Sequence, residues 1–486
     1  MKQSLKPIMF VGTGSDVGKS VLNAGFCRIF LQDGYQPAPF KAQNMSLNSY
    51  VTPDGLEIGR AQAMQAEASG IDCRVEMNPI LLKPTSNKTS QVVLNGKPAG
   101  NQSARSYFFK TDRQVLFREA IKAYQTLADT YNPIVIEGAG SISEINLWDK
   151  DITNMKIAVA TQAATYLVAD IDRGGVFGSV YGTLALLPEE ERALIKGIVI
   201  NKFRGDLSLF DEGRKMLYEL TKVPVAGVIP YFRDIYTEQE DSVVIDNKKA
   251  TAQEGKINIA VVLLPRMSNF TDFDNLEFVP EVHLYYAHTP DEIAKADIIM
   301  LPGSKNTIED LEYLKEKGID LVIKKHVDSG KQLYGICGGY QMMGREIRDP
   351  YHVETTRDRV EGLDLLPLTT TLTKTKKTEQ TQFTFLNTPQ TCSGYEIHMG
   401  ETQLDAQRPL CTTAHGVDGF MLNDKVWGTY IHGIFDNAVV VEHILKQINP
   451  GISVDLNYKA FKDKEYDKLA ALIRASVDMD YIYSTL

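Results

Sequence analysis

The amino-acid sequence predicts an α/β protein of two successive domains, each built on a parallel β-sheet. Three observations support this fold class. Short apolar segments alternate with helical segments through the first half of the chain, which is the βαβ pattern of a doubly wound sheet. A polar segment at 241–256, taken as a linker, interrupts this pattern, which starts again at residue 257. At 486 residues the chain is also too long for one core, since domains usually hold about 100–200 residues.

The first domain is predicted to span residues 1–245. Its strands are short apolar runs bounded by Gly, Pro or Asn, and they are expected at 8–11, 134–136, 166–168, 198–200 and 225–229. Between the strands, helices are expected at 20–32, where Gly34 follows the last turn, and at 112–129. The alternation favours a doubly wound sheet.

The second domain is predicted to span residues 256–440. Its first strand is expected at 257–263, and later strands are expected at 298–301, 332–336 and 426–431. A Thr- and Lys-rich segment at 369–384 is expected to form β-hairpins, because apolar and polar residues alternate near its end.

The C-terminal residues 441–486 are predicted to form a helical extension packed on the second domain. Phe461, Leu469, Leu472 and Ile473 have the spacing of one face of an amphipathic helix. A surface of the neighbouring domain is expected to cover that face.

Composition narrows the classes of partner. A net charge of −10 without a basic stripe argues against nucleic acid. No segment approaches the roughly 20 apolar residues of a membrane span. The five cysteines are scattered and form no C-x-x-C pair, which fits a reducing compartment and argues against disulfides or structural zinc. We expect a cytoplasmic protein that binds small molecules, and the sequence leaves a homo-oligomer open.

A phosphate-binding loop is predicted at 12–20, with the sequence GTGSDVGKS, between the first strand and the first helix. Backbone N–H groups and the helix N-terminus can hold phosphate oxygens there. Lys19 would place its charge on the β- and γ-phosphates of ATP, and Ser20 would offer its hydroxyl to Mg²⁺. The residues expected to bind ATP in this loop are Thr13, Gly14, Gly18, Lys19 and Ser20.

Two acids are candidates for the Mg²⁺ site. Glu137 ends a buried strand beside the loop, where the second magnesium contact of such proteins usually lies, although it could merely cap the next helix. Asp16 could assist inside the loop or simply cap it. The predicted magnesium ligands are therefore Ser20, Glu137 and Asp16.

Three further polar positions follow predicted strands of the first domain. Lys41 could neutralise charge on a transferring phosphoryl group, or it could be a solvated loop lysine. Asn201 could read a purine edge or could cap a loop. Asp172 and Arg173 lie in a charged cluster with Asp170, where Arg173 could bind a substrate carboxylate or form a structural pair.

A cysteine nucleophile is predicted at Cys337, in the segment 335–339 with the sequence GICGG. An apolar strand precedes it and a helix follows, so the segment reads as a nucleophile elbow in which glycines relieve crowding. The helix N-terminus favours the thiolate form of the cysteine.

The cysteine needs a base and an oxyanion hole. His432 ends a later strand, and the carboxyl ends of parallel strands meet at one edge, so it can reach Cys337. His398 is expected to position or pack instead. Gly303 follows another strand and, with the N–H of Gly338, could hold an oxyanion, while Lys305 beside it could meet a substrate carboxylate or nothing.

These motifs resemble a known family. The cysteine elbow and the late histidine are similar to a class I glutamine amidotransferase domain, which has a flavodoxin-like fold, and the phosphate loop is similar to that of dethiobiotin synthetase. The order of the two, with 301–307 (LPGSKNT), 394–400 (GYEIHMG) and 428–435 (GTYIHGIF), resembles the cobyrinic and cobyric acid amidating enzymes. The segments 41–48 (KAQNMSLN) and 59–65 (GRAQAMQ) narrow the resemblance to the cobyric acid branch.

The resemblance implies a glutamine-hydrolysing, ATP-dependent amidoligase of cobalamin biosynthesis. Cys337 would form a glutamyl thioester and release ammonia, while MgATP would phosphorylate a substrate carboxylate that ammonia then converts to an amide. The implied substrate is adenosylcobyrinic acid a,c-diamide, amidated at its b, d, e and g carboxylates. The block around Lys41 adds Gln43 and Asn44 as candidates for substrate binding.

One position departs from the wider amidotransferase pattern. Most enzymes of that class carry an acid two residues after the histidine, where this chain has Ile434, so the group that orients His432 stays open. Asp436 is nearby but lies on the wrong side of the strand alternation, and Glu396 is a candidate.

Three alternatives accompany this interpretation. The nearest is the earlier enzyme, cobyrinic acid a,c-diamide synthase, and a second is another glutamine-dependent amidoligase, such as one acting on a cell-wall precursor. A third is a regulatory ATPase of the partitioning type with a vestigial cysteine domain, which would carry an additional lysine early in the loop. Positions 12–17 contain no lysine.

Overall fold

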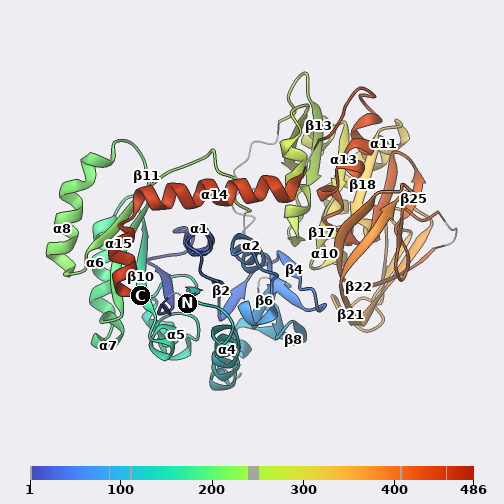
Figure 1. Ribbon diagram of the computed structural model, residues 1–486. Coiled ribbons are helices and arrows are strands. Elements are labelled where there is room, and N and C mark those ends of the chain that lie inside the picture. Colours follow the sequence, from blue (N-terminus) through green and yellow to red (C-terminus); the bar gives the residue numbers. More distant parts are fainter. Residues whose placement is uncertain (1–2, 87, 110–111, 239–250, 405–407, 456) are drawn as a thin grey trace.

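The computed structural model describes residues 3–86, 88–109, 112–238, 251–404, 408–455 and 457–486. Two α/β bodies lie side by side, and the long helix α14 (Tyr458–Ser476) runs along the first toward the second (Figure 1). Most of the expected linker, residues 241–250, lies outside the described part of the chain. Within that part, no helix combines the length and apolar character that a membrane span requires.

The first body is built on a six-stranded parallel sheet with the order β12-β11-β10-β1-β9-β2. The strands are β1 (Ile8–Gly12), β2 (Ala38–Phe40), β9 (Ile134–Glu137), β10 (Ala164–Asp170), β11 (Ile195–Phe203) and β12 (Val225–Pro230). Five of them confirm the strands predicted for this domain. The strand order reverses at β1, and doubly wound sheets bind ligands in the crevice at the carboxyl end of such a strand.

Helices cover both faces of this sheet, which is why its strands are apolar throughout. On one face, Phe10 of β1 packs against Phe26 of helix α1 (Lys19–Gln32), with ring centroids 4.8 Å apart. The other face is covered by helices α4 (Arg113–Ala128), α6 (Val176–Leu186) and α8 (Asp211–Thr221). Helices α1 and α4 confirm the two helices predicted for this domain.

The extension predicted at 441–486 divides between the two bodies. Its first part, 441–454, packs on the second body as expected, whereas helix α14 and the final helix α15 (Met479–Thr485) pack on the first, which corrects the expectation for those two helices. Leu469 and Ile473 are buried against α1, where a Cβ on Gly25 would lie 2.1 Å from Ile473 Cδ1. The first turn of α14 also reaches the second body, since Phe461 lies 4.3 Å from Phe278 between ring centroids. The amphipathic spacing defines an apolar face but does not say which surface covers it.

The second body contains a six-stranded sheet with the order β15-β13-β16-β18-β26-β25. The strands are β13 (Ile257–Val262), β15 (Val282–Ala287), β16 (Ile298–Leu301), β18 (Gln332–Ile336), β25 (Phe420–Asn423) and β26 (Val426–Thr429). The five parallel strands have the flavodoxin-like order 2-1-3-4-5, and β25 joins antiparallel at the edge. The carboxyl ends of β16, β18 and β26 therefore share one edge.

A long antiparallel ribbon lies beside this sheet. It consists of β21 (Leu368–Phe385) and β22 (Thr391–Leu404), so the Thr- and Lys-rich segment forms a hairpin as predicted. The strand predicted at 426–431 is split, because the chain leaves the parallel sheet after β26. After one residue, Tyr430, the chain forms β27 (Ile431–His432), which pairs with β22, and this pairing places His432 opposite Tyr395.

The two bodies meet through a small hairpin of the first, formed by β4 (Ser49–Val51) and β5 (Glu57–Gly59). The side chain of Gln380 donates to the Val51 carbonyl at 2.7 Å, and Thr378 donates to the Gly55 carbonyl at 2.7 Å. Strand β21 of the second body therefore docks on this hairpin through backbone carbonyls.

Candidate active sites

Cys337 occupies the predicted elbow between β18 and the short helix α12 (Gly338–Met342). Its backbone has φ 49° and ψ −106°, which is a strained conformation for a residue with a side chain and is typical of nucleophile elbows. The cysteine is 7% exposed, so the thiol faces the interior of the second body rather than bulk water.

His432 and Asp272 form a buried pair beside this elbow. The imidazole Nδ1 donates to Asp272 Oδ2 at 2.7 Å, and the Gly433 N–H donates to Asp272 Oδ1 at 2.9 Å. Within the described residues, His432 Nε2 has no hydrogen-bond partner, so it is the nitrogen available to Cys337. Burial lowers the pKa of His432, but the charges of Asp272 and Cys337 outweigh burial and raise it to about 10.

Asp272 answers the question that the sequence left open. The two acids considered there bind elsewhere, Glu396 to His398 at 3.1 Å and Asp436 to Asn275 at 2.6 Å. Asp272 lies in the 3-10 helix η5 (Phe270–Phe278), shortly after the first strand of the second body. A search for acids that follow strand ends would have included Asp272. It would not have singled this residue out, because the same helix contains two more acids.

The proposed oxyanion groups also come together. Gly303 belongs to β17 (Gly303–Ser304), which pairs with β14 (Met267–Ser268). A Cβ on Gly303 would lie 3.2 Å from His432 Cε1, and a Cβ on Gly338 would lie 2.8 Å from the Ser304 nitrogen. The β17 backbone, the start of α12 and the imidazole therefore surround one small volume, as an acyl-transfer site requires.

His398 has a packing role, as the sequence favoured. Its ring stacks on Tyr430 with centroids 3.8 Å apart, and its Nδ1 lies 2.8 Å from the Gly400 carbonyl oxygen. The ring face of His398 and its Nδ1 therefore both contact neighbouring groups of the second body.

A cavity of about 380 Å³ opens beside Cys337. The second body supplies most of its wall, including Ser304, Lys305 and Glu354, while the first body supplies Lys83 and neighbouring residues of its β-hairpins. Both bodies therefore shape the space in front of the nucleophile.

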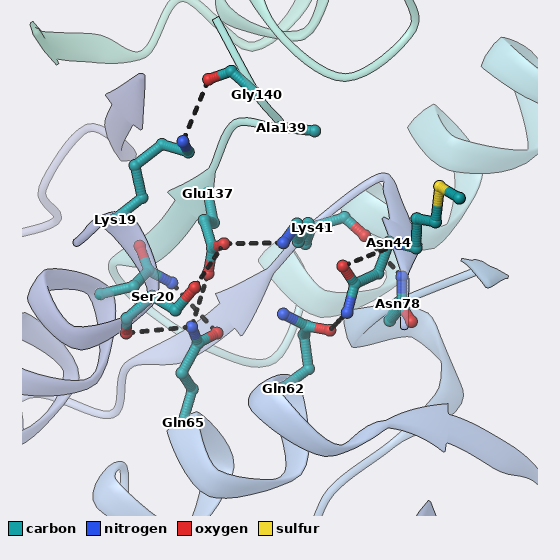
Figure 2. Close-up of polar contacts among 12 residues, drawn as sticks. Lys19, Ser20, Lys41, Asn44, Gln62, Gln65, Asn78, Glu137, Ala139 and Gly140 are labelled. Atoms are coloured by element: carbon teal, nitrogen blue, oxygen red, sulfur yellow. Dashed lines mark hydrogen bonds and ion pairs between the residues drawn. The ribbon is translucent and has the colours of Figure 1, made fainter. Parts of the chain in front are cut away.

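The phosphate loop follows β1 and leads into α1 as predicted. Lys19 Nζ donates to the Gly140 carbonyl oxygen at 3.0 Å (Figure 2). It also donates to the Gly14 carbonyl oxygen at 3.0 Å, and the two contacts hold the ammonium over the loop. Gly18 has φ 96°, and a Cβ there would lie 2.2 Å from Asn201 Nδ2, so this position requires glycine.

Glu137 is the centre of a buried polar cluster at the carboxyl end of β9 (Figure 2). Its carboxylate accepts hydrogen bonds from Ser20 at 2.9 Å, Lys41 at 2.8 Å and Gln65 at 2.7 Å. Burial raises the pKa of Glu137, but the charge and hydrogen bond of Lys41 outweigh burial and keep the pKa below its usual value. A carboxylate and a hydroxyl are hard oxygen donors of the kind that Mg²⁺ prefers, so these residues fit the metal.

The block around Lys41 lies next to this cluster. Lys41 is 6% exposed and paired with Glu137, which excludes the alternative of a solvated loop lysine. Asn44 is buried and donates to Gln62 at 3.1 Å, while Gln43 accepts a hydrogen bond from Tyr107 at 2.6 Å. Gln62 and Gln65, both on helix α2 (Arg60–Ala68), belong to the 59–65 segment that carried the resemblance, but they were not among the predicted site residues.

The remaining candidates lie around the mouth of the loop. Asn201 donates to the Val17 carbonyl at 2.8 Å, which supports the loop-capping interpretation. Asp172 is paired with Arg204, whereas Arg173 is 71% exposed and lies 3.9 Å from Asp16. Arg173 therefore remains accessible at the ligand edge of the sheet.

Comparison with known proteins gives matches to both bodies. Residues 8–243 match a family described as the CobQ/CobB/MinD/ParA nucleotide binding domain, and residues 258–440 match the CobB/CobQ-like glutamine amidotransferase domain. A protein of Parabacteroides distasonis named cobyric acid synthase is 59% identical, with all of both chains covered. Proteins of the same name from Bacteroides fragilis and Streptococcus sanguinis are 54% and 45% identical, and the matches cover at least 99% of each chain.

Proposed function

The chain belongs to the cobyric acid synthase family and is a glutamine-dependent, ATP-using amidoligase, and from this premise we propose its substrate and the roles of its residues. The proposed substrate is adenosylcobyrinic acid a,c-diamide, whose b, d, e and g carboxylates become amides. The proposed division of labour assigns ATP-dependent amidation to residues 1–245 and glutamine hydrolysis to residues 256–440. The positions of the two family matches support this division.

In the glutaminase half-reaction, His432 Nε2 takes the proton of Cys337, and the thiolate attacks the side-chain amide of glutamine. The N–H of Gly338 and the backbone around Gly303 stabilise the oxyanion. His432 then gives this proton to the amide nitrogen, the C–N bond breaks and ammonia leaves, and water hydrolyses the glutamyl thioester to glutamate and the free thiol. The short hydrogen bond from His432 to Asp272 supports this assignment, because it fixes the tautomer and orientation of the base.

In the synthetase half-reaction, a substrate carboxylate attacks the γ-phosphate of ATP, the bond to the β–γ bridging oxygen breaks, and ADP leaves as the acyl phosphate forms. Ammonia displaces phosphate, which is a better leaving group than oxide, and the amide forms. The loop residues Thr13, Gly14 and Gly18, together with Lys19, would hold the phosphates. Ser20 and Glu137 would hold Mg²⁺, which when bound neutralises charge that develops on the phosphates.

The corrinoid contacts are proposed from position. Lys41, Gln43 and Asn44 follow β2 at the ligand edge of the sheet, and Arg173 is an exposed cation at the same edge. Arg173 is proposed to meet a peripheral carboxylate, because a guanidinium binds a carboxylate through two hydrogen bonds.

One observation carries the proposal. A buried cysteine, histidine and aspartate lie in one body, a phosphate loop lies in the other, and full-length relatives at up to 59% identity are named cobyric acid synthase. The test is mass-resolved amidation of adenosylcobyrinic acid a,c-diamide with MgATP, for the wild type and Cys337→Ala, each with glutamine or with ammonium.

We expect the wild type to add four amides with either glutamine or ammonium as the nitrogen source. The variant is expected to add them from ammonium but not from glutamine. A wild type that hydrolyses glutamine and leaves this corrinoid unchanged would show that the proposed substrate is wrong. Cobyrinic acid, offered in a parallel reaction, identifies the earlier a,c-amidating activity if it is the compound consumed.

A further inference from the structure

The cavity beside Cys337 carries more charge than the hydrolysis of an amide requires. Its volume of about 380 Å³ lies at the small end of the roughly 300–1,000 Å³ typical of ligand pockets, which suits a small substrate. Glutamine carries an α-carboxylate and an α-ammonium group, and burying either one without a partner is costly. A glutamine site therefore needs one cation and one anion away from the nucleophile.

Among the described residues, four lysines line the cavity, and three of them have a partner within the protein. Lys83 and Lys376 both bind the buried carboxylate of Glu57, with N–O distances of 2.8 Å and 2.5 Å. Lys374 is exposed and lies over the ring of Tyr351, 5.5 Å from its centroid.

Lys305 is the remaining cation. It makes no ion pair within 4.0 Å in the described part of the chain, although burial lowers its pKa and therefore works against its charge. It lies two residues after Gly303, so it borders the proposed oxyanion hole. A half-buried ammonium that lines the cavity is best compensated by a substrate anion.

Glu354 supplies the complementary charge. Of the cavity-lining residues that the structure describes, it is the one with a carboxylate. It accepts hydrogen bonds from the Ile308 N–H at 3.1 Å and from the Thr307 hydroxyl at 3.4 Å, which fix its position at the start of helix α10 (Thr307–Glu316). Burial raises the pKa of Glu354 to about 7, while the charge of Lys305 acts in the opposite direction.

Both groups border the nucleophile. The Thr307 hydroxyl that binds Glu354 would lie 3.3 Å from a Cβ on Gly338, the residue after Cys337. The Lys305 ammonium interacts electrostatically with both Glu354 and Cys337. Lys305 and Glu354 form no ion pair with each other within 4.0 Å, although both line the cavity.

We propose that Lys305 and Glu354 recognise the amino-acid end of glutamine, Lys305 binding the α-carboxylate and Glu354 the α-ammonium group. This inference rests on the proposed glutaminase activity and adds its specificity determinants. The carboxamide would then lie at Cys337, with the two backbone charges held on either side of the cavity. Neither residue takes part in bond breaking, so their loss is expected to raise KM for glutamine more than it lowers kcat.

The test pairs two variants with two glutamine analogues. Glutaramic acid lacks the α-ammonium group, and 4-aminobutanamide lacks the α-carboxylate, while both retain the amide. Ammonia release from each compound is measured for the wild type, Glu354→Gln and Lys305→Met. Lys374→Met removes a lysine from the same cavity wall and serves as the matched control, and Lys305→Arg tests whether a cation restores binding.

The wild type should prefer glutamine over each analogue by roughly 10–150-fold in kcat/KM, the range for one hydrogen bond to a charged group. Glu354→Gln should lose the discrimination against glutaramic acid and keep that against 4-aminobutanamide. Lys305→Met should show the reverse, and Lys374→Met should resemble the wild type. Ammonium-dependent amidation should be unchanged in all variants, which shows that each one is folded.

Either of two results would overturn the assignment. One is a Glu354→Gln variant that still discriminates against glutaramic acid as the wild type does. The other is a loss of activity toward all three amides alike, with ammonium-dependent amidation retained, since that pattern indicates damage to the catalytic groups. A failure of the corrinoid assignment would instead appear as missing amidation with normal glutamine discrimination, so the two failures are distinguishable.

Discussion

Replacing Asp272 with asparagine is the most direct test of the glutaminase geometry. The His432–Asp272 hydrogen bond is 2.7 Å long, and the side chains of both residues are at most 2% exposed. Asparagine keeps the size of the side chain but removes the charge that compensates the imidazolium. Leaving a buried charge without its partner costs roughly 3–5 kcal/mol, which corresponds to a roughly 150–5,000-fold loss of kcat for glutamine hydrolysis.

The pH dependence gives a second readout that a merely structural role would not produce. Burial lowers the pKa of His432, whereas Asp272 and Cys337 raise it, with a net value of about 10. Removing the Asp272 carboxylate therefore lowers this pKa. The alkaline limb of the kcat/KM profile for glutamine is expected to move to lower pH in Asp272→Asn.

The assay is ammonia release from glutamine, with ammonium-dependent amidation as the measure of an intact first body. Glu396→Gln is the matched control, because Glu396 was the other candidate and binds His398 instead. The reasoning is refuted if Asp272→Asn keeps wild-type glutaminase activity and an unshifted pH profile. It is equally refuted if Glu396→Gln shows the larger loss.

Three further predictions concern the phosphate loop, the contact between the bodies and the C-terminal helix. Gly18→Ala should abolish amidation from both nitrogen sources, because the new Cβ would collide with the Asn201 side-chain amide and distort the phosphate loop. Glutamine hydrolysis should stay intact, and retained amidation would contradict the loop geometry. Glu57→Gln should lower stability at pH 7 by about 3–5 kcal/mol, measured by denaturant unfolding, because Lys83 and Lys376 lose their shared carboxylate. Burial raises the pKa of Glu57, but the charges of the two lysines outweigh burial and hold this pKa well below its usual value of 4.5. The contribution of the ion cluster to stability is therefore complete above pH 4.5 and is lost as pH falls through the lowered pKa. A Glu57→Gln variant with unchanged stability at pH 7 would count against the ion cluster. Ile473→Ala should cost about 2–5 kcal/mol in the same measurement, whereas Leu472→Ala, which removes a half-buried side chain at the edge of the same cluster, should cost less, and equal losses would argue against packing of Ile473 on α1.

Several features of this fold are local, and the sequence was sufficient to predict them. Five of the six strands of the first sheet are short apolar runs bounded by breakers, so burial on both faces is visible in the residues themselves, whereas the three-residue strand β2 was not predicted. The phosphate loop and the cysteine elbow are also local, because glycines at fixed positions determine the turn and the adjoining helix. His432 was predicted from the rule that the carboxyl ends of parallel strands meet at one edge, and the structure places it in β27, shortly after the parallel strand β26 ends at that edge.

Other features depend on contacts between residues far apart in the chain, and only the tertiary structure decided them. Asp272 lies 160 residues before His432, and nothing in its own segment distinguishes it from the neighbouring acids. The amphipathic spacing of α14 predicted a helix but not its partner, since the apolar stripe fits any complementary surface and Gly25 of α1 provides it.

The charges of the cavity show the same division. The sequence identified Lys305 as a cation near the oxyanion turn but could not place Glu354, 49 residues later, in the same cavity. Local patterns determine strands, turns and helices, because the forces that form them act between near neighbours. The pairing of buried charges is decided by which surfaces meet after folding, and that information is carried by the tertiary structure.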